Sequence, residues 1–149
     1  MTKSLWDEST RRDLIARARR LTPAHHARWG KLTVDRMLAH MVDAFRMGMG
    51  EIEVRPRKIP VIGRWPFNVL FIRFIGMPKN APTVREIIER PPGSIDAELG
   101  ELEAAMERFA AQHERTEWPR HPAFGKLSRS SWGVLGYVHT DHHLRQFGV

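Results

Sequence analysis

The sequence contains no cysteine among its 149 residues. This absence excludes disulfide bonds, thiolate ligands for a metal ion and a cysteine nucleophile. Long hydrophobic runs are missing too: the longest, from Trp65 to Met77, is interrupted by Asn68 and Arg73 and is too short to span a bilayer. The first residues hold no apolar stretch of the kind that a signal peptide needs. From these absences we expect a soluble, cytoplasmic protein without a membrane partner.

Sequence signatures of several functional classes are absent as well. No internal repeat, low-complexity tract, zinc finger, helix-turn-helix motif, nucleotide-binding loop or Ser–His–Asp order is visible. The formal charge of +7 and the pI of about 10.7 can indicate a nucleic-acid partner. However, the basic residues are scattered along the chain and form no platform interleaved with aromatic residues. A solvated basic surface is therefore favoured over nucleic-acid binding.

The pattern of apolar residues predicts four amphipathic helices in a single domain, residues 1–149. Hydrophobic residues make up 42% of the chain and charged residues 28%, which indicates a globular protein with a sizeable core. Helices are expected over residues 7–20 with Ser9 or Thr10 as cap, from Thr33 to about Met49, from Ser94 past Phe109, and from Ser128 or Ser130 to Gly148. The third helix has the strongest apolar period, and its carboxylates, Glu98 among them, are expected to face solvent.

A long connection of low regularity, residues 51–93, separates the second and third predicted helices and holds seven of the ten prolines. Within it, residues 67–75 are expected to form a short helix over the core. One interpretation is a crossover that covers the open side of a helix bundle. Another is a lid or pocket wall, with Trp65, Phe67 and Phe71 lining a substrate site, and a membrane or dimer contact is a third. We favour the crossover, which could also line a pocket, and predict an all-α, four-helix-bundle fold.

Two histidines near the C-terminus lie in the middle of the helix face that should point inward. His139 and His143 are four residues apart, so they lie one above the other on one face of the helix. Buried polar groups are costly unless they have partners, and a metal ion is one such partner. His40 lies at the edge of the apolar face of the second helix and is a candidate third ligand. Three imidazoles suit a divalent ion such as Zn²⁺, Ni²⁺ or Fe²⁺ and leave a position for water or substrate.

Other side chains near these histidines are candidates for supporting roles. Gln146, one turn after His143, and Asp43, nearly one turn after His40, are expected to orient the rings. His142 is rotated off the centre of the face and is an alternative ligand, a proton shuttle or a surface residue. His121 either closes one side of the site or lies on the surface.

The terminal motif also resembles a known family. His139-x-x-His142-His143-x-x-Gln146, with His40 on an earlier helix, resembles the DinB-like (YfiT-like) superfamily of metal-dependent enzymes, and the likeness extends over nearly the whole chain. The sequence looks like one uncharacterised bacterial branch of it, although Leu144-Arg145 stands where Arg-Gly is common. Further segments carry the likeness, namely Trp29-Gly30-Lys31-Leu32-Thr33, Met37-Leu38-Ala39-His40 and His121-Pro122-Ala123-Phe124-Gly125.

The resemblance implies a four-helix bundle with a long crossover between its second and third helices, often as a homodimer. It also implies that His40, His139 and His143 are the ligands of a divalent metal ion. Relatives include S-transferases that use low-molecular-weight thiols, an isomerase and hydrolases. We therefore expect a metal-dependent enzyme acting on a small molecule. The alternative is a non-catalytic bundle that binds metal for stability or serves as a protein-interaction module.

Overall fold

Four long helices account for most of the regular structure in this computed structural model, which describes residues 2–57 and 61–149. They are α1 (Glu8–Ala18), α2 (Val34–Met49), α4 (Ile95–Ala111) and α5 (Arg129–Gln146). Three short elements lie between α2 and α4, namely α3 (Phe67–Leu70), the π-helical turn η1 (Phe71–Ile75) and the 3₁₀ turn η2 (Arg85–Ile87). No strand occurs within the described ranges, so the predicted all-α class is confirmed there.

Local sequence signals explain where the helices begin and end. The hydroxyls of Ser94 and Ser128 accept hydrogen bonds from backbone N–H groups in the first turns of α4 and α5, as expected for N-caps. Thr33 stands at the N-cap of α2, and Gly50 ends that helix in the left-handed conformation with a φ of 85°. The expected cap of α1 is wrong: the helix begins after Asp7, so Ser9 and Thr10 lie inside its first turn.

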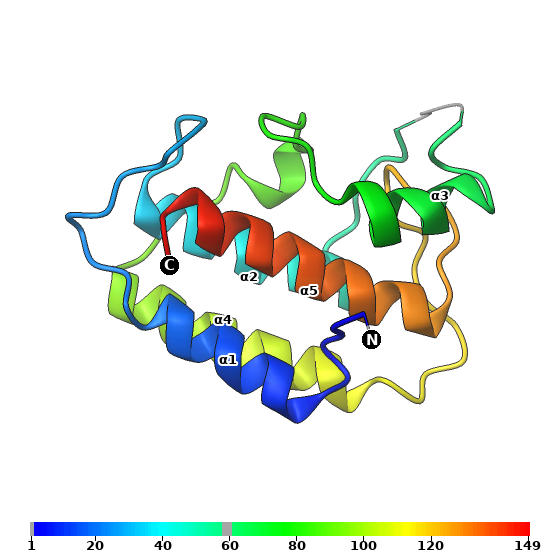
Figure 1. Cartoon of the computed structure of the whole chain (residues 1–149), viewed down its shortest axis with the longest axis horizontal. Helices are drawn as coiled ribbons and strands as arrows, with labels where there is room; N and C mark the ends of the chain where they lie inside the picture. Colours follow the sequence, from blue (N-terminus) through cyan, green and yellow to red (C-terminus); the bar gives the residue numbers. More distant parts are fainter. Residues whose placement is uncertain (1, 58–60) are drawn as a thin grey trace.

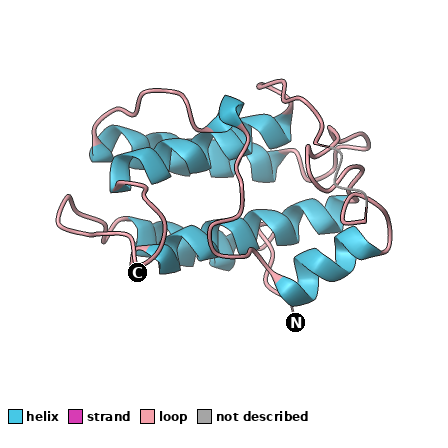
Figure 2. Ribbon diagram, turned by 90° about the horizontal axis from the view of Figure 1, so that it is seen from above, coloured by secondary structure: helices cyan, strands magenta, loops and turns pink. Residues whose placement is uncertain are grey.

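The four long helices contact one another in a closed ring around the core. α5 packs against α1 and α2, and α4 completes the ring by packing against α2 and α1. In Figure 1, α5 lies in front of α2 in the upper half of the molecule and α1 lies in front of α4 in the lower half. The view from above shows the two rows of helices, with one connection running between the rows near the middle and others at their ends (Figure 2). This arrangement places the inward faces of α2 and α5 next to each other.

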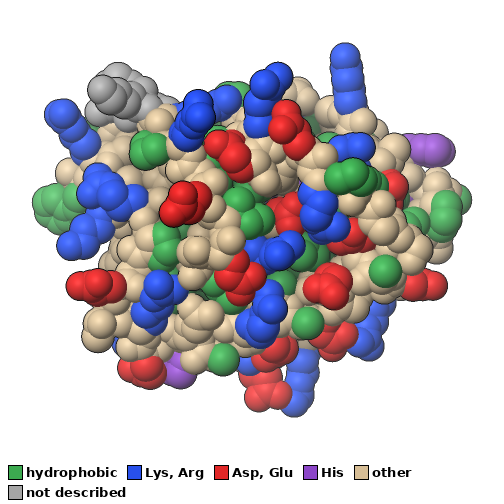
Figure 3. Space-filling view, turned by 180° about the vertical axis from the view of Figure 1, so that it is seen from behind, with side chains coloured by type: hydrophobic (Ala, Val, Ile, Leu, Met, Phe, Trp, Pro, Cys, Tyr) green, Lys and Arg blue, Asp and Glu red, His purple; other side chains and the backbone are tan. Residues whose placement is uncertain are grey.

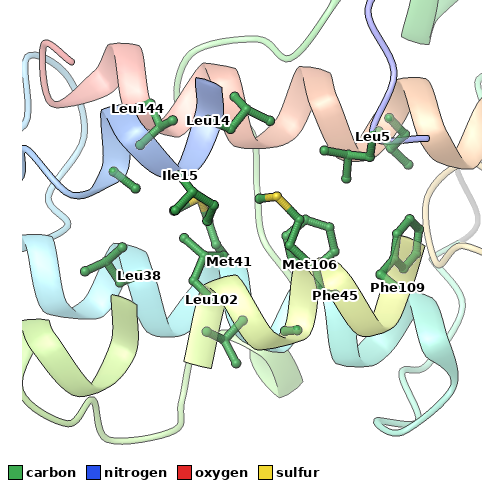
Figure 4. Close-up of a cluster of buried hydrophobic side chains, with 14 of the residues drawn as sticks. Leu5, Leu14, Ile15, Leu38, Met41, Phe45, Leu102, Met106, Phe109 and Leu144 are labelled. Carbon is green, nitrogen blue, oxygen red and sulfur yellow. The ribbon is translucent and has the colours of Figure 1, made fainter. Parts of the chain in front are cut away.

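The core between the helices is built from the apolar stripes that the sequence predicts. Leu38 and Met41 of α2 meet Leu102 and Met106 of α4, and all four are fully buried (Figure 4). Each such side chain contributes about 1.5–3 kcal/mol by leaving water. Leu5 extends this cluster from the N-terminal segment.

The described residues of this connection, 51–57 and 61–93, cross over the ring of helices, as the favoured interpretation predicts, and the short helix expected at residues 67–75 forms as α3 and η1. Asn68 anchors it, because its buried amide nitrogen donates to the carbonyls of Phe124 and Lys126 at 3.1 and 3.2 Å. The alternative interpretation, a pocket wall, is wrong for Trp65 and Phe67, which are exposed, whereas Phe71 does line the cavity described below. None of the helices in the described part of the chain is both long and apolar enough to cross a membrane.

Candidate metal centre

Packing of α2 against α5 brings three histidines together. His40 lies on α2, and His139 and His143 occupy consecutive turns of α5. The Nε2 atom of His139 lies 3.1 Å from the Nε2 atom of His40 and 3.1 Å from that of His143. One ring nitrogen from each residue lies within 4.8 Å of the other two. The spacing on α5 was local and visible in the sequence, whereas the approach of His40 depends on how the helices pack.

Hydrogen bonds on the far side of two rings fix their protonation. The Nδ1 atom of His40 lies 2.9 Å from the carbonyl oxygen of Ile87, which can only accept, so this Nδ1 carries the proton. His143 Nδ1 lies 2.9 Å from Oε1 of Gln146, and the amide nitrogen of Gln146 donates to the carbonyl of Trp29 at 2.7 Å. The amide orientation makes Oε1 the acceptor for His143 Nδ1–H. Both rings therefore direct an unprotonated Nε2 at the cluster.

These tautomers leave the cluster with more lone pairs than protons. His139 has one ring proton, and even when it lies on Nε2 it can form a full hydrogen bond to only one neighbouring Nε2. The remaining lone pair is then a buried acceptor without a good partner, which is costly. A cation that accepts all three lone pairs removes this cost, and an Nδ1–H bound to a carbonyl is the usual support of a ligating histidine. Thus the chemistry of the donor set fits a metal ion.

Burial keeps the three rings neutral, which is the form that binds metal. Loss of hydration lowers the pKa of His143 to about 3, with a further contribution from nearby His40. Burial likewise lowers the pKa of His40, and it lowers that of His139 well below its usual value, helped by the neighbouring histidines. A metal ion therefore does not have to displace protons from these rings at neutral pH.

The cluster forms part of the wall of a cavity of about 400 Å³. Its other walls come mostly from apolar side chains of α2, α4, α5, the crossover and the connection between α4 and α5, among them Phe45, Phe71, Phe109, Phe124 and Trp132. No aspartate or glutamate of the described chain lines it, and its only charged lining residues there are Lys31 and Arg57. A small ligand with an apolar body fits such a space, and the charge balance favours an anionic or hydrogen-bond-accepting group on it.

His142 and His121 both line this cavity but lie outside the cluster of three. His142 is buried against the edge of Trp29, with ring centroids 5.4 Å apart, so it is not a surface residue. The His121 ring packs between Phe124 and Trp132. Its Nδ1 accepts the backbone N–H groups of Ala123 and Phe124 at 3.1 Å each, and burial lowers its pKa to about 4. His121 is therefore neutral at pH 7, with its proton on Nε2.

Asp43 does not orient His40, and this expectation is wrong. Both ring nitrogens of His40 are engaged elsewhere, and the Asp43 carboxylate accepts from Nε of Arg90 at 3.1 Å. Arg90 also donates to both carboxylate oxygens of Glu98, at 2.8 and 2.9 Å. The expectation that Glu98 faces solvent is wrong too, because Glu98 is buried in this ion-pair network. The network fixes the end of the crossover to α2 and α4, near the Ile87 carbonyl that orients His40.

Two supporting groups were missed in the sequence. The Ile87 carbonyl is a backbone group, so no residue type marks it. Trp29 supports the site in two ways, because its backbone carbonyl fixes Gln146 and its ring packs on His142. The only sequence signal for Trp29 was a large aromatic side chain in the connection before Thr33. Gln146 was predicted for this role from its position one turn after His143, and it does contact that ring.

The fold and the site together define a helical protein in which three histidines, two buried and one half-buried, converge on a cavity wall and could hold a metal ion. A family model described as a protein of unknown function (DUF1569) matches residues 9–148. The match covers nearly the whole chain, and the chain belongs to this family. Neither a curated protein nor a solved structure matches the chain.

Proposed function

We propose that the protein is a metal-dependent enzyme that transforms a small molecule in the cavity beside His40, His139 and His143. The observation that carries this proposal is the convergence of three Nε2 atoms, two of them deprotonated by hydrogen bonds at Nδ1. Three protein ligands are typical of catalytic sites, whereas structural zinc sites usually have four. A divalent ion such as Zn²⁺, Ni²⁺ or Fe²⁺ would supply Lewis acidity that ionises a bound water or thiol near neutral pH.

The cavity favours catalysis over a purely structural metal site. A metal that only stabilised the helices would need no adjoining space, but here about 400 Å³ lies against the three rings. His121 is placed in the same cavity as a neutral hydrogen-bond donor, since its Nδ1 is occupied by two backbone N–H groups. We infer that its Nε2–H binds an acceptor atom of the substrate. His121 cannot act as a base in this tautomer, so it positions or polarises the substrate.

We further propose that the chain is a DinB-like four-helix bundle and that one substrate is a low-molecular-weight thiol. The closed ring of α1, α2, α4 and α5, the long crossover after α2 and the placement of His40 apart from the α5 pair support this relation. The absence of carboxylates from the described cavity walls, together with Lys31 and Arg57, suits an anionic thiol. Hydrolysis by an ionised water is the second reaction that the same groups support.

Metal content tests the first step of this proposal. Protein purified without an affinity tag is analysed for elements as wild type, His143→Ala and His26→Ala, the last being an exposed histidine outside the cluster. We expect near-stoichiometric Zn, Ni or Fe in the wild type and in His26→Ala, and its loss in His143→Ala. If the wild type binds no metal even after incubation with each ion, the metalloenzyme proposal is refuted.

A spectroscopic titration tests the thiol. The wild-type protein is loaded with Co²⁺ and titrated with a small thiol, with a matched alcohol as control. A new near-ultraviolet charge-transfer band with the thiol alone would support thiol binding at the metal. If the thiol leaves the spectrum unchanged while ester substrates are hydrolysed by the wild type and not by His143→Ala, the enzyme is a hydrolase instead.

A further inference from the structure

The exposed apolar side chains of the protein are concentrated in one short segment. All six large hydrophobic residues that are exposed in the described chain lie between residues 61 and 75: Val61, Trp65, Phe67, Leu70, Phe74 and Ile75. Trp65 is 80% exposed, Phe74 79% and Ile75 68%. Single exposed apolar residues are ordinary, but a cluster of this size marks an interaction surface. We call these six residues the apolar patch.

Apart from Asn68 and Arg73, the helical segment that carries most of the patch, residues 67–75, consists of apolar residues. Asn68 and Ile72, four residues apart, point into the protein and are buried. Phe67, Leu70 and Phe74 lie on other sides of α3 and η1 and remain exposed. A helix that is hydrophobic all round is normally covered on every side. The exposed side of this helix therefore lacks the packing partner that its apolar composition leads us to expect.

The same part of the sequence carries all the excess positive charge of the chain. Seven Lys or Arg residues and no Asp or Glu lie between residues 54 and 85, so the rest of the chain holds 17 residues of each sign and is neutral. Basic residues occur along the whole chain, but only in residues 54–85 are they not matched by acidic residues. This corrects the interpretation of a generally basic surface. Figure 3 shows hydrophobic side chains beside Lys and Arg side chains at the left edge, where α3 lies after the rotation from Figure 1.

Most of the described basic side chains of residues 54–85 form no ion pair with a carboxylate of the described chain. In the described ranges, the ion pair between Arg85 and Glu89 is the only one that a basic side chain of residues 54–85 forms. Arg64 is exposed, and Arg73 donates to the neutral hydroxyl of Ser130. Unpaired cations next to exposed Trp, Phe and Ile side chains are the combination that binds the interface of an anionic bilayer.

We propose that the apolar patch and its flanking cations dock the protein on the surface of an anionic phospholipid membrane. The aromatic and aliphatic side chains would enter the interfacial layer while the cations contact lipid phosphates, without any helix crossing the bilayer. This differs from the expectation of no membrane partner. A symmetric dimer through the patch is the competing occupant, but it would bring two segments of the same strong positive charge together. The proposal is independent of the metal site.

Vesicle co-sedimentation tests this proposal with the whole chain. The protein is mixed with vesicles of phosphatidylcholine alone or of an equimolar mixture with phosphatidylglycerol, at ~0.1 M and ~1 M salt, between which the screening length falls from about 10 to about 3 Å. We expect binding to the mixed vesicles only, weakened at high salt. Oligomeric state is measured in parallel by light scattering.

Two pairs of variants separate the contribution of the apolar side chains to vesicle binding from that of the positive charges. Phe74→Ser with Ile75→Ser removes apolar surface, and Phe74→Leu with Ile75→Val is the control that retains it. Arg64→Glu with Arg73→Glu reverses charge beside the patch. Arg20→Glu with Arg12→Glu makes the same charge change on and just beyond α1, and both of these arginines are exposed. Binding to the mixed vesicles should fall roughly tenfold or more in the two patch variants and stay within about twofold in the two controls.

Three results would overturn the proposal. Wild-type protein that binds neither kind of vesicle shows that the patch has another occupant. Equal losses in the α1 variant and in the Arg64 and Arg73 variant show binding by overall charge rather than by this surface. A dimer that becomes a monomer in the Phe74 and Ile75 serine variant, with no vesicle binding, assigns the patch to a second copy of the chain.

Discussion

Replacing Gln146 by leucine is expected to weaken metal binding at the histidine cluster about 10- to 100-fold, or about 1.4–2.8 kcal/mol. In the wild type, Gln146 Oε1 accepts the Nδ1–H of His143 at 2.9 Å and holds both the ring orientation and the tautomer. Leucine accepts no hydrogen bond. The His143 proton is then free to move to Nε2, where it blocks the atom that faces the cluster.

Gln146→Glu is the matched control. Both variants lose the amide group that donates to the Trp29 carbonyl at 2.7 Å, so both should lower the unfolding free energy of the metal-free protein by about 1–3 kcal/mol. Only the glutamate retains an acceptor for His143 Nδ1–H. The difference in metal affinity between the two variants therefore isolates the orientation of His143 from the general loss of stability.

Affinity is measured by competition with a chromophoric zinc chelator, and stability by urea unfolding of the metal-free proteins. We expect Gln146→Glu to bind zinc within about threefold of the wild type and Gln146→Leu to bind it at least about tenfold more weakly. If leucine binds zinc as tightly as glutamate, the hydrogen bond at Nδ1 does not control the cluster and the assigned tautomer of His143 is wrong.

Four further outcomes are expected. Burial lowers the pKa of His143 to about 3, so below pH 6.5 the unfolded chain takes up a proton before the folded chain does. Urea unfolding should therefore show that the metal-free protein loses stability as the pH falls from 6.5. A flat pH profile would contradict this. Glu98→Gln should lower the unfolding free energy by about 3 kcal/mol, since it removes one partner of a buried ion pair with Arg90. The Arg90 guanidinium lowers the pKa of Glu98 from its ordinary value of 4.5, so this stabilisation is complete above pH 4.5 and is lost as the pH falls through the lowered pKa. If the stability of Glu98→Gln depended on acid pH as that of the wild type does, the pairing would be refuted. His121→Phe should retain bound metal by elemental analysis but lower turnover about 100-fold, and loss of metal would instead assign His121 to the metal site. Zinc at about 100 times its dissociation constant should stabilise the wild type by about 2.7 kcal/mol in urea unfolding and leave His143→Ala unchanged.

Much of the fold could be predicted because its signals are local. The apolar period of α4 and the N-cap positions of Thr33, Ser94 and Ser128 depend only on neighbouring residues, and the structure confirms them, although only the two serine hydroxyls accept a capping hydrogen bond. The amphipathic pattern also places most core residues. It failed for Glu98, which lies beside the apolar face but is drawn into the protein by Arg90. That arginine comes from the crossover, and helical periodicity contains no information about which distant cation will approach.

The candidate site also has one part that local sequence determines and another part that tertiary packing determines. The sequence by itself determined that His139, His143 and Gln146 share one face of one helix, because a helix fixes the positions of residues three and four apart. Only the tertiary structure decided that His40 meets them, because this depends on the packing of α2 against α5. It also decided that a backbone carbonyl orients His40 in place of Asp43.

The apolar patch combines the two kinds of information. Sequence alone determined that residues 54–85 hold seven basic residues and no acidic one. Only the tertiary structure decided which apolar side chains of that segment are left in solvent, because burial depends on what the rest of the chain covers. Asn68 and Ile72 are covered by the fold, and Trp65, Phe74 and Ile75 are not. Local order thus follows from the sequence, while exposure and convergence follow from contacts between distant residues.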